Sequence, residues 1–171
     1  AWSKTDFYPG PVMDSTAYSI YTDSAWNYMW NLKKTEIEYH KAHWNQAGYQ
    51  PIHDILTWPG NGNIVLGQAA HLAPFYDANG DGAYNPLDGD YPLILGDQSL
   101  FFIFNDDRNI HSETQGNKMK IEVHGMAYVF DMPGDSAFNN TVFLKYKLFN
   151  RSQWAFYQTY IGNFTDFDIG W

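Results

Sequence analysis

The sequence predicts a mainly β fold: an antiparallel, β-sandwich-like domain with one N-terminal helix and a long, loop-rich insertion. Three observations predict it. Long aromatic and β-branched runs with a period of two fill the chain after residue 118. Residues 48–117 are rich in Gly, Pro, Asn and Asp, which is typical of loops. A capping-box spacing near residue 35 marks the start of a helix.

The composition supports a packed core and excludes several classes of protein. Hydrophobic residues make up 44% of the 171 residues, enough for a substantial core in a single domain, 1–171. No apolar run approaches the ~20 residues that cross a bilayer. The start lacks a signal-peptide pattern, so we expect any signal peptide to have been removed. The absence of cysteine excludes disulfides, and the net charge of −9 argues against a nucleic-acid partner.

The N-terminal two thirds of the chain divide into two parts. Residues 1–23 contain a Pro-Gly-Pro string and predict an extended segment. Residues 24–117 are predicted to hold the helix and the loop-rich region. Within them Thr35 stands three residues before Glu38, so we expect a helix over roughly 36–46. Brief apolar runs such as NIVLG and LFFIF predict two or three short strands over the core.

Residues 118–171 predict the antiparallel strands. The runs KMKIEVHGMAYVF, TVFLKYKLFN and WAFYQTYIGNF are aromatic and β-branched and have period-two character. The strings DMPGDSAFNN and RSQ supply the turns between them. We expect these strands to form one side of a sandwich.

The stretch DANGDGAYNPLD, residues 77–88, has the spacing of an EF-hand calcium loop with Asp at its last position. Alternate side chains converge on one point only if the backbone coils around it, and Gly82 stands where the loop must turn sharply. Three carboxylates so close together repel one another unless a cation neutralises them. We therefore expect structural calcium with the ligands Asp77, Asn79, Asp81, Ala83 (through its carbonyl), Asn85 and Asp88.

The same string has an alternative interpretation, a tandem of Asx turns, because Asn-Gly and Asp-Gly are ordinary turn dipeptides. The predominance of Asp over Glu, 15 to four, fits loops as well as calcium. The pattern resembles the calcium loop of dockerin modules, which likewise end in Asp. Pro92 follows soon after and precludes the long exiting helix of an EF-hand.

Two other clusters are candidates for metal sites. Asp166 and Asp168 point the same way on an extended segment and form either half of a cation site or a solvated strand end. His40 and His43 share a helical face and His53 follows, but no third zinc ligand is fixed by the spacing. We expect these histidines to lie on the surface.

No motif for nucleophilic catalysis or phosphate binding is found in the sequence. The string Asn105-Asp106-Asp107 follows an apolar run and offers acids for glycoside hydrolysis, but nothing fixes their separation, and a turn or further calcium ligands is expected. The string WPGNGN, residues 58–63, predicts a rigid turn with Trp58 packed inward. The many aromatic side chains fill a core or, alternatively, form a platform for sugars.

Several strings together resemble a family of large, secreted surface proteins of Bacteroidota, which are typically exported by the type IX secretion system. They are WNLKKTEIEYH, WPGNGN, LAPFYDANGDGAYNPLDGDYPLILGDQ, FIFND, TVFLKYKLFNRS and YIGNFTDFDIG. The resemblance covers roughly residues 24–171, and the third string is its most specific part. In such relatives the last string runs on into further acidic residues, so the chain looks like a fragment of a longer protein. The resemblance implies an extracellular location and calcium dependence.

We therefore expect an extracellular, cell-surface adhesion or structural module without catalytic activity, stabilised by calcium and contacting glycans or other surface proteins. One alternative is a carbohydrate-binding module or part of a polysaccharide-active enzyme, with an exposed aromatic platform or two facing carboxylates. Another is a subunit of an extracellular filament or sheath, joined through unpaired strand edges. We expect neither a transmembrane segment nor a nucleic-acid partner.

Overall fold

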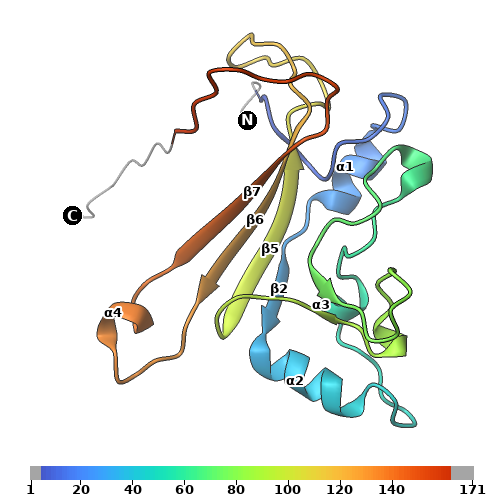
Figure 1. Ribbon diagram of the computed structural model, residues 1–171, viewed down its shortest axis with the longest axis vertical. Coiled ribbons are helices and arrows are strands. Elements are labelled where there is room, and N and C mark those ends of the chain that lie inside the picture. Colours follow the sequence, from blue (N-terminus) through green and yellow to red (C-terminus); the bar gives the residue numbers. More distant parts are fainter. Residues whose placement is uncertain (1–4, 163–171) are drawn as a thin grey trace.

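The computed structural model describes residues 5–162 (Figure 1). Its helices and strands follow one another in the order β1 (Tyr8–Pro9), α1 (Ile20–Trp26), β2 (Trp30–Lys33), α2 (Lys34–His43), α3 (His53–Leu56), η1 (Ile64–Leu66), β3 (Phe75–Tyr76), η2 (Pro86–Asp88), β4 (Tyr91–Pro92), β5 (Gln98–Asn105), β6 (Ile121–Val129), α4 (Ser136–Asn139) and β7 (Phe143–Asn150). No helix within residues 5–162 has the length and apolar character that crossing a bilayer requires.

One antiparallel sheet organises the molecule. Its strands run in the order β1-β5-β6-β7, and β2 pairs with the other part of the same edge of β5. Each long strand pairs with the next along the chain, so the predicted antiparallel, mainly β fold is confirmed. Two of the predicted strands are wrong: WAFYQTYIGNF forms no strand in its described residues, 154–162, and NIVLG forms the 3-10 helix η1. Within residues 5–162 the only other sheet is the two-stranded β3–β4 pair, which does not form the second half of a sandwich.

The helices differ from the prediction in number and in position. The predicted helix corresponds to α2, which begins two residues earlier because Glu36, and not Glu38, accepts a hydrogen bond from the Lys33 backbone N–H at 2.8 Å. Helix α1 lies partly in the expected extended segment. Its first turn is closed by Ser19 and Thr22, each of which accepts a hydrogen bond from the other's backbone N–H. A Ser-x-x-Thr box is a weaker sequence signal than Ser-x-x-Glu, so the pattern did not predict this helix.

The core lies on one face of the sheet, under the helices and loops, on the right in Figure 1. We call this the inner face. The buried side chains of β2, β5 and β6 meet those of the loop-rich region there. Trp58 is buried as predicted, and its indole N–H donates to the Pro74 carbonyl at 3.0 Å. Burying each such large apolar side chain stabilises the fold by about 1.5–3 kcal/mol.

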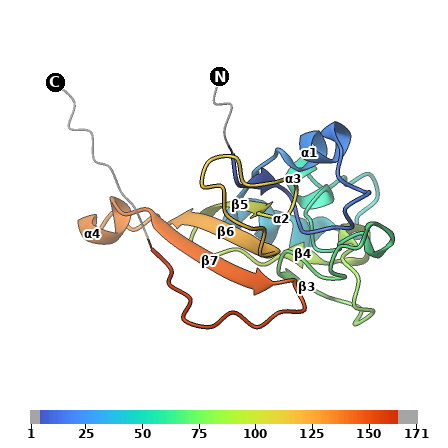
Figure 2. The same ribbon diagram turned by 90° about the horizontal axis from the view of Figure 1, so that it is seen from above.

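The opposite face of the same sheet is also apolar. We call it the outer face; cross-strand register and alternation assign it Leu100, Phe102, Phe104, Val123, Gly125, Ala127, Leu144, Tyr146 and Leu148. No helix packs on it in Figures 1 and 2, where α1, α2 and α3 all lie on the inner side. The far ends of β6 and β7 run past the core to the turn that carries α4 (Figure 1). One face of the sheet is thus covered by helices and loops, whereas on the other face Val123 is buried and the β7 side chains Leu144, Tyr146 and Leu148 are about half exposed.

Candidate functional site

The loop predicted to bind calcium begins with Asp77, whose carboxylate is occupied by the loop's own backbone. It accepts hydrogen bonds from the N–H groups of Gly80 at 2.7 Å and Gly82 at 2.8 Å. The bond from Gly82 is the largest cause that holds the pKa of Asp77 below its ordinary value. Gly80 and Gly82 have φ angles of 76° and 79°, which only glycine adopts at low cost. The turn is therefore built around Asp77.

The next two polar side chains repeat this arrangement. Asn79 accepts a hydrogen bond from the N–H of Asp81 at 3.0 Å, and Asp81 accepts one from the N–H of Ala83 at 2.8 Å. The Asn79 amide also donates to the second oxygen of Asp81 at 3.1 Å. The two bonds from backbone N–H groups each close an Asx turn, in which a side-chain oxygen accepts from the N–H two residues ahead.

Asp90 closes the other end of the loop, and it lies outside the predicted ligand set. It is fully buried, and its two oxygens accept from the backbone N–H groups of Ala78 and Asn85, both at 2.8 Å. The side chain of Asn85 donates to Asp88 at 2.5 Å. One buried carboxylate thus ties the two ends of the loop together.

The calcium prediction is wrong. Among residues 5–162 no group of three or more His, Cys, Asp or Glu side chains could hold a metal ion. The predicted ligands Asp77, Asn79, Asp81, Ala83, Asn85 and Asp88 bond within the loop instead. The side chains of Asn79, Asp81 and Asn85 each accept from the N–H group two residues ahead, which is the Asx turn that the sequence also allowed. Asp77 accepts from N–H groups three and five residues ahead, and Asp88 accepts from the Asn85 side chain. The backbone N–H donors that point at the Asp77 and Asp81 oxygens offset the repulsion between the carboxylates.

Within residues 5–162 no group that could hold a metal ion includes the candidate zinc ligands His40, His43 and His53. His40 is fully buried, contrary to the expectation of a surface residue, with its ring nitrogens 2.9 Å from the Asp90 carbonyl and 3.1 Å from the Tyr49 hydroxyl. Burial lowers the pKa of this imidazole. His43 stacks on the ring of Tyr39 instead. Both histidines support packing.

The acids proposed for glycoside hydrolysis are also structural. Asp106 is fully buried and accepts hydrogen bonds from the N–H groups of Met119 and Ile121, both at 2.7 Å. Asn105 is fully buried and donates to the Gly10 carbonyl at 2.8 Å. These bonds connect β5 to its neighbours and leave no pair of carboxylates facing across a groove at this triplet. Asp166 and Asp168 lie outside the described residues.

Sequence reasoning missed a buried ionic network on β6. Glu122 is fully buried and accepts hydrogen bonds from Arg151 at 2.6 Å, from His124 at 2.8 Å and from the Val12 N–H at 2.8 Å. Burial opposes its ionisation, but these donors outweigh burial and place the pKa of Glu122 below its ordinary value. The network fastens the N-terminal segment and the end of β7 to β6. Its members are distant in sequence, so no local pattern reveals them.

Strand β7 is the open edge of the sheet. Within residues 5–162 it pairs only with β6, and its outer-face side chains Leu144, Tyr146 and Leu148 are 59%, 49% and 47% exposed. Lys145 and Lys147 alternate with them and belong to the inner face, opposite Met126 and His124. The strand therefore presents one apolar row and one basic row.

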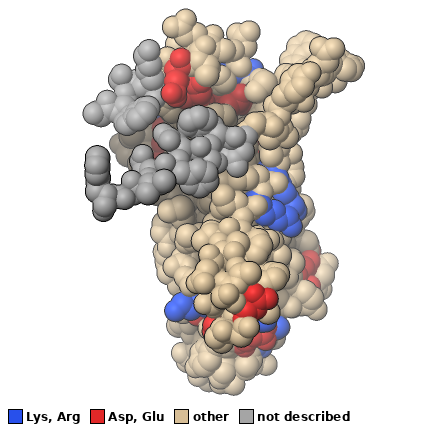
Figure 3. Space-filling view, turned by 90° about the vertical axis from the view of Figure 1, so that its left-hand side faces the viewer, with Lys and Arg blue, Asp and Glu red and all other residues tan. Residues whose placement is uncertain are grey.

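An aromatic row crosses the outer face beside β7. The ring of Phe102 lies 6.2 Å from Phe104 and 6.3 Å from Tyr146, and Phe7 meets Phe104 edge-on at 5.5 Å. Gly125 makes this possible, since a Cβ there would lie 2.3 Å from the Phe102 ring. Figure 3 shows this side of the molecule, where charged side chains form small separate groups on a surface of other residue types.

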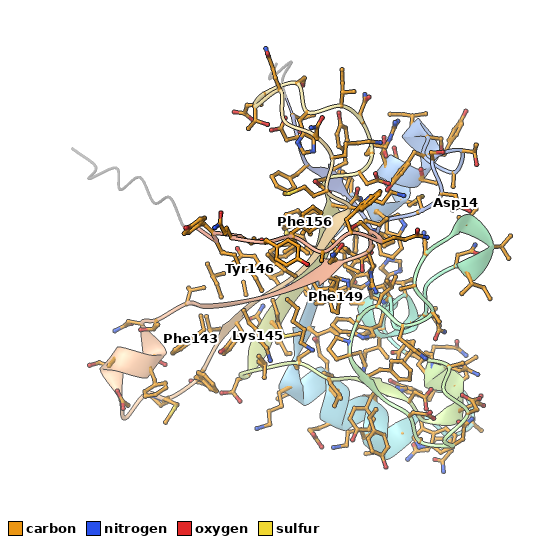
Figure 4. All side chains as sticks on the ribbon, turned by 45° about the horizontal axis from the view of Figure 1, so that its top comes forward. Asp14, Phe143, Lys145, Tyr146, Phe149 and Phe156 are labelled. Atoms are coloured by element: carbon orange, nitrogen blue, oxygen red, sulfur yellow. The ribbon has the colours of Figure 1, made fainter. Side chains whose placement is uncertain are left out.

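A groove of about 420 Å³ runs under the inner side of β7. Its walls come from the loops around β3 and β4 and from β5, β6 and β7, and its lining residues include Leu93, Phe101, Met126, Lys145, Lys147 and Phe149. Figure 4 shows Lys145 and Tyr146 on β7, with Phe156 on the segment that follows the strand. The groove therefore lies on the inner-face side of the open edge.

Comparisons with known proteins identify no relative. No protein-family model matches the chain, and neither the curated proteins nor the solved structures include a match. The resemblance to secreted Bacteroidota proteins therefore stays a prediction, and the candidate site is defined by its own geometry: an open, two-faced edge strand beside an uncovered apolar surface.

Proposed function

We propose that the protein is a non-catalytic adhesion or structural module of the cell exterior that holds another protein by adding one of its strands to β7. The observation that carries this proposal is the open edge of β7, with an apolar row on one face and a basic row on the other. The resemblance of the sequence to secreted surface proteins supports the extracellular location.

The backbone of β7 supplies the first part of the binding energy. In an antiparallel pair alternate residues of a strand direct their N–H and C=O groups to the neighbour, and the rest direct them outwards. Strand β7 has eight residues, Phe143–Asn150, and one neighbour. Such an edge is a template for another extended chain. Added strands gain affinity from backbone hydrogen bonds and specificity from alternate side chains.

The charge of β7 selects the class of partner. If two copies paired through β7 in an antiparallel register centred on Tyr146, Lys145 and Lys147 would face lysine on the same side of the sheet. Like charges directly opposite each other destabilise a strand pair. In this register the two lysines oppose self-pairing and favour a strand with acidic side chains.

The outer face of β7 adds a second requirement for the partner strand. A strand with acidic side chains on the inner face must place its alternate side chains on the outer face, beside Leu144, Tyr146 and Leu148. These positions and the aromatic row favour apolar side chains. The proposed partner is therefore an extended segment of another surface protein in which acidic and apolar residues alternate. Such a partner would extend the sheet by one strand beyond β7.

A pair of synthetic peptides tests this function. One alternates glutamate with valine over eight residues, and the control alternates lysine with valine. We expect the glutamate peptide to bind with an affinity that falls as salt is raised, and we expect little binding of the lysine peptide. Isothermal titration calorimetry measures both.

A charge reversal sharpens the test. The double variant Lys145→Glu, Lys147→Glu should prefer the lysine peptide, whereas the control Lys33→Glu, on β2, should keep the original preference. Failure of both peptides to bind, or equal binding of both to the unmodified protein, would show that β7 does not capture an acidic strand.

A further inference from the structure

A second, separate pocket lies where the loop before β6 meets the turn after β7. It measures about 470 Å³, within the range of roughly 300–1,000 Å³ that is typical of small-ligand sites. Three of the ten Lys and Arg residues of this acidic chain line it: Lys118, Lys120 and Arg151. A protein of net charge −9 thus has a local basic site.

The floor of this pocket contains an unsatisfied carboxylate oxygen. The Asp107 side chain is 3% exposed, and its Oδ1 is the one buried side-chain oxygen or nitrogen within residues 5–162 that lacks a hydrogen bond. Lys118 Nζ lies 3.5 Å from this oxygen and hydrogen-bonds to the Asp107 carbonyl at 2.8 Å. Lys120 Nζ lies 3.9 Å from Oδ2. The enclosed Asp107 carboxylate thus lies against both ammonium groups and holds the two lysines at the pocket.

Arg151 forms one wall of the pocket and is held rigidly. It donates to Glu122 through Nε at 3.2 Å and Nη2 at 2.6 Å, and its guanidinium lies 4.6 Å from the centre of the Phe149 ring. These contacts use only part of the five N–H donors of a guanidinium. The other donors are available to an anion without the entropic cost of ordering a free arginine.

An exposed tryptophan stands beside these cations. Trp154 is 75% exposed, yet its backbone is fixed: its N–H donates to Ser152 Oγ at 3.1 Å, and its carbonyl accepts from the Asn150 amide at 2.6 Å. Ser152 Oγ donates to Asn150 Oδ1 at 2.6 Å and braces the turn. A large apolar ring held in solvent is placed to stack on a flat apolar surface.

We infer that this pocket binds a sugar that carries a negative group, a hexuronate or a sulfated hexose of an acidic polysaccharide. The anionic group pairs with Lys120 and Arg151, and the C–H face of the ring stacks on Trp154. Asp107 and Glu122 hold the cations in place. This inference does not depend on strand addition at β7, since the two sites share no residue.

Three oligosaccharides test the pocket on the full chain. Oligogalacturonate supplies carboxylates, a sulfated galactan oligosaccharide supplies sulfates, and an uncharged galactan oligosaccharide is the matched control. Tryptophan fluorescence and calorimetry should detect binding of at least one anionic sugar, with the uncharged sugar at least about tenfold weaker because charge-assisted hydrogen bonds are lost. Binding of the carboxylate or of the sulfate ligand alone identifies which anion the pocket prefers.

Variants show whether this pocket is the one used. Trp154→Ala and Lys120→Gln should each weaken binding about tenfold, while the controls Tyr21→Ala and Lys33→Gln leave it unchanged. All four positions are exposed, so circular dichroism should show an unchanged fold. The inference is overturned if no anionic sugar binds, if the uncharged sugar binds equally well, or if Trp154→Ala and Lys120→Gln bind like the unmodified protein. Competition by inorganic phosphate at equal potency would also overturn it, because it would show a site for small anions and not for a sugar.

Discussion

The loop at residues 77–90 and the open side of the sheet around β7 contrast in how completely their polar groups are used. The loop is rich in charge, yet its carboxylates accept from its own backbone, at Gly80 and Gly82 and, through Asp90, at Ala78 and Asn85. Strand β7 has an ordinary strand sequence, yet within residues 5–162 its outer edge pairs with no strand, and its outer-face side chains Leu144, Tyr146 and Leu148 are about half exposed. We therefore expect binding at β7, whose outward hydrogen-bonding groups have no partner strand within residues 5–162, and not at the loop, where the acidic residues are densest.

The contrast depends on which hydrogen-bond partners each group can reach, and the amino-acid composition does not show this. Asp and Asn side chains are short enough to bond to N–H groups two or three residues ahead, so a string of them satisfies itself when glycines let the chain turn. An edge strand cannot satisfy itself, because its outward groups need another chain. The predictions below test the two regions in turn.

Within the loop, removal of Asp90 should produce the largest loss of stability. Asp90→Ala removes a fully buried carboxylate and leaves the N–H groups of Ala78 and Asn85 without their acceptor, so we expect the free energy of unfolding to fall by about 3 kcal/mol. Thermal or urea unfolding measures it. Asp88→Ala is the matched control at an exposed position and should cost no more than about 0.5 kcal/mol. If the two substitutions lowered the free energy of unfolding equally, Asp90 would hold the loop no more strongly than an exposed acid does.

Glu122 should make stability depend on acid. Because its folded pKa lies below the ordinary value of 4.5, its contribution is fully present above pH 4.5 and is lost as pH falls from there through the folded pKa. Glu122→Gln should lower stability at pH 7 by about 2 kcal/mol and flatten the decline below pH 4.5. Unfolding curves between pH 7 and pH 3 measure both. A decline equally steep in the variant would exclude Glu122 as the cause.

The glycines of the loop should have a smaller, purely conformational effect. Gly82 has a φ of 79°, and a Cβ there would meet no atom within 4 Å. Gly82→Ala should therefore cost about 1 kcal/mol through backbone strain alone. Gly134 is also open to a Cβ and does not have a positive φ, so Gly134→Ala is the control and should cost nothing. If Gly82→Ala left the free energy of unfolding unchanged, the loop would not keep this turn.

The open side should tolerate polar substitution with the smallest change. Tyr146 and Leu148 are about half exposed, so Tyr146→Thr and Leu148→Thr should each change the free energy of unfolding by less than about 1 kcal/mol. Phe101→Ala on the inner face of β5, where the side chain is 2% exposed, should instead cost about 3–5 kcal/mol. Chemical unfolding distinguishes them. Equal losses would mean that the outer face is covered in solution.

The sequence predicts much of the fold and little of the site. Alternation along β6 and β7 predicts the antiparallel strands, and WPGNGN predicts the inward turn of Trp58. Whether carboxylates bind a cation or backbone N–H groups depends on where those groups point after folding, and both arrangements use the same residues at the same spacing. The clamp by Asp90 and the pairing of Glu122 with Arg151 join distant segments, so no local pattern identifies them.

Residue-resolved amide hydrogen exchange on the isolated protein tests the central contrast most directly. The N–H groups of Gly80, Gly82 and Ala83 are bonded to side chains of the loop, whereas alternate N–H groups of β7 point away from β6. We predict that the loop amides exchange more slowly than the outward amides of β7. Exchange that is fast throughout the loop and slow at every amide of β7 would contradict a self-satisfied loop beside an open strand.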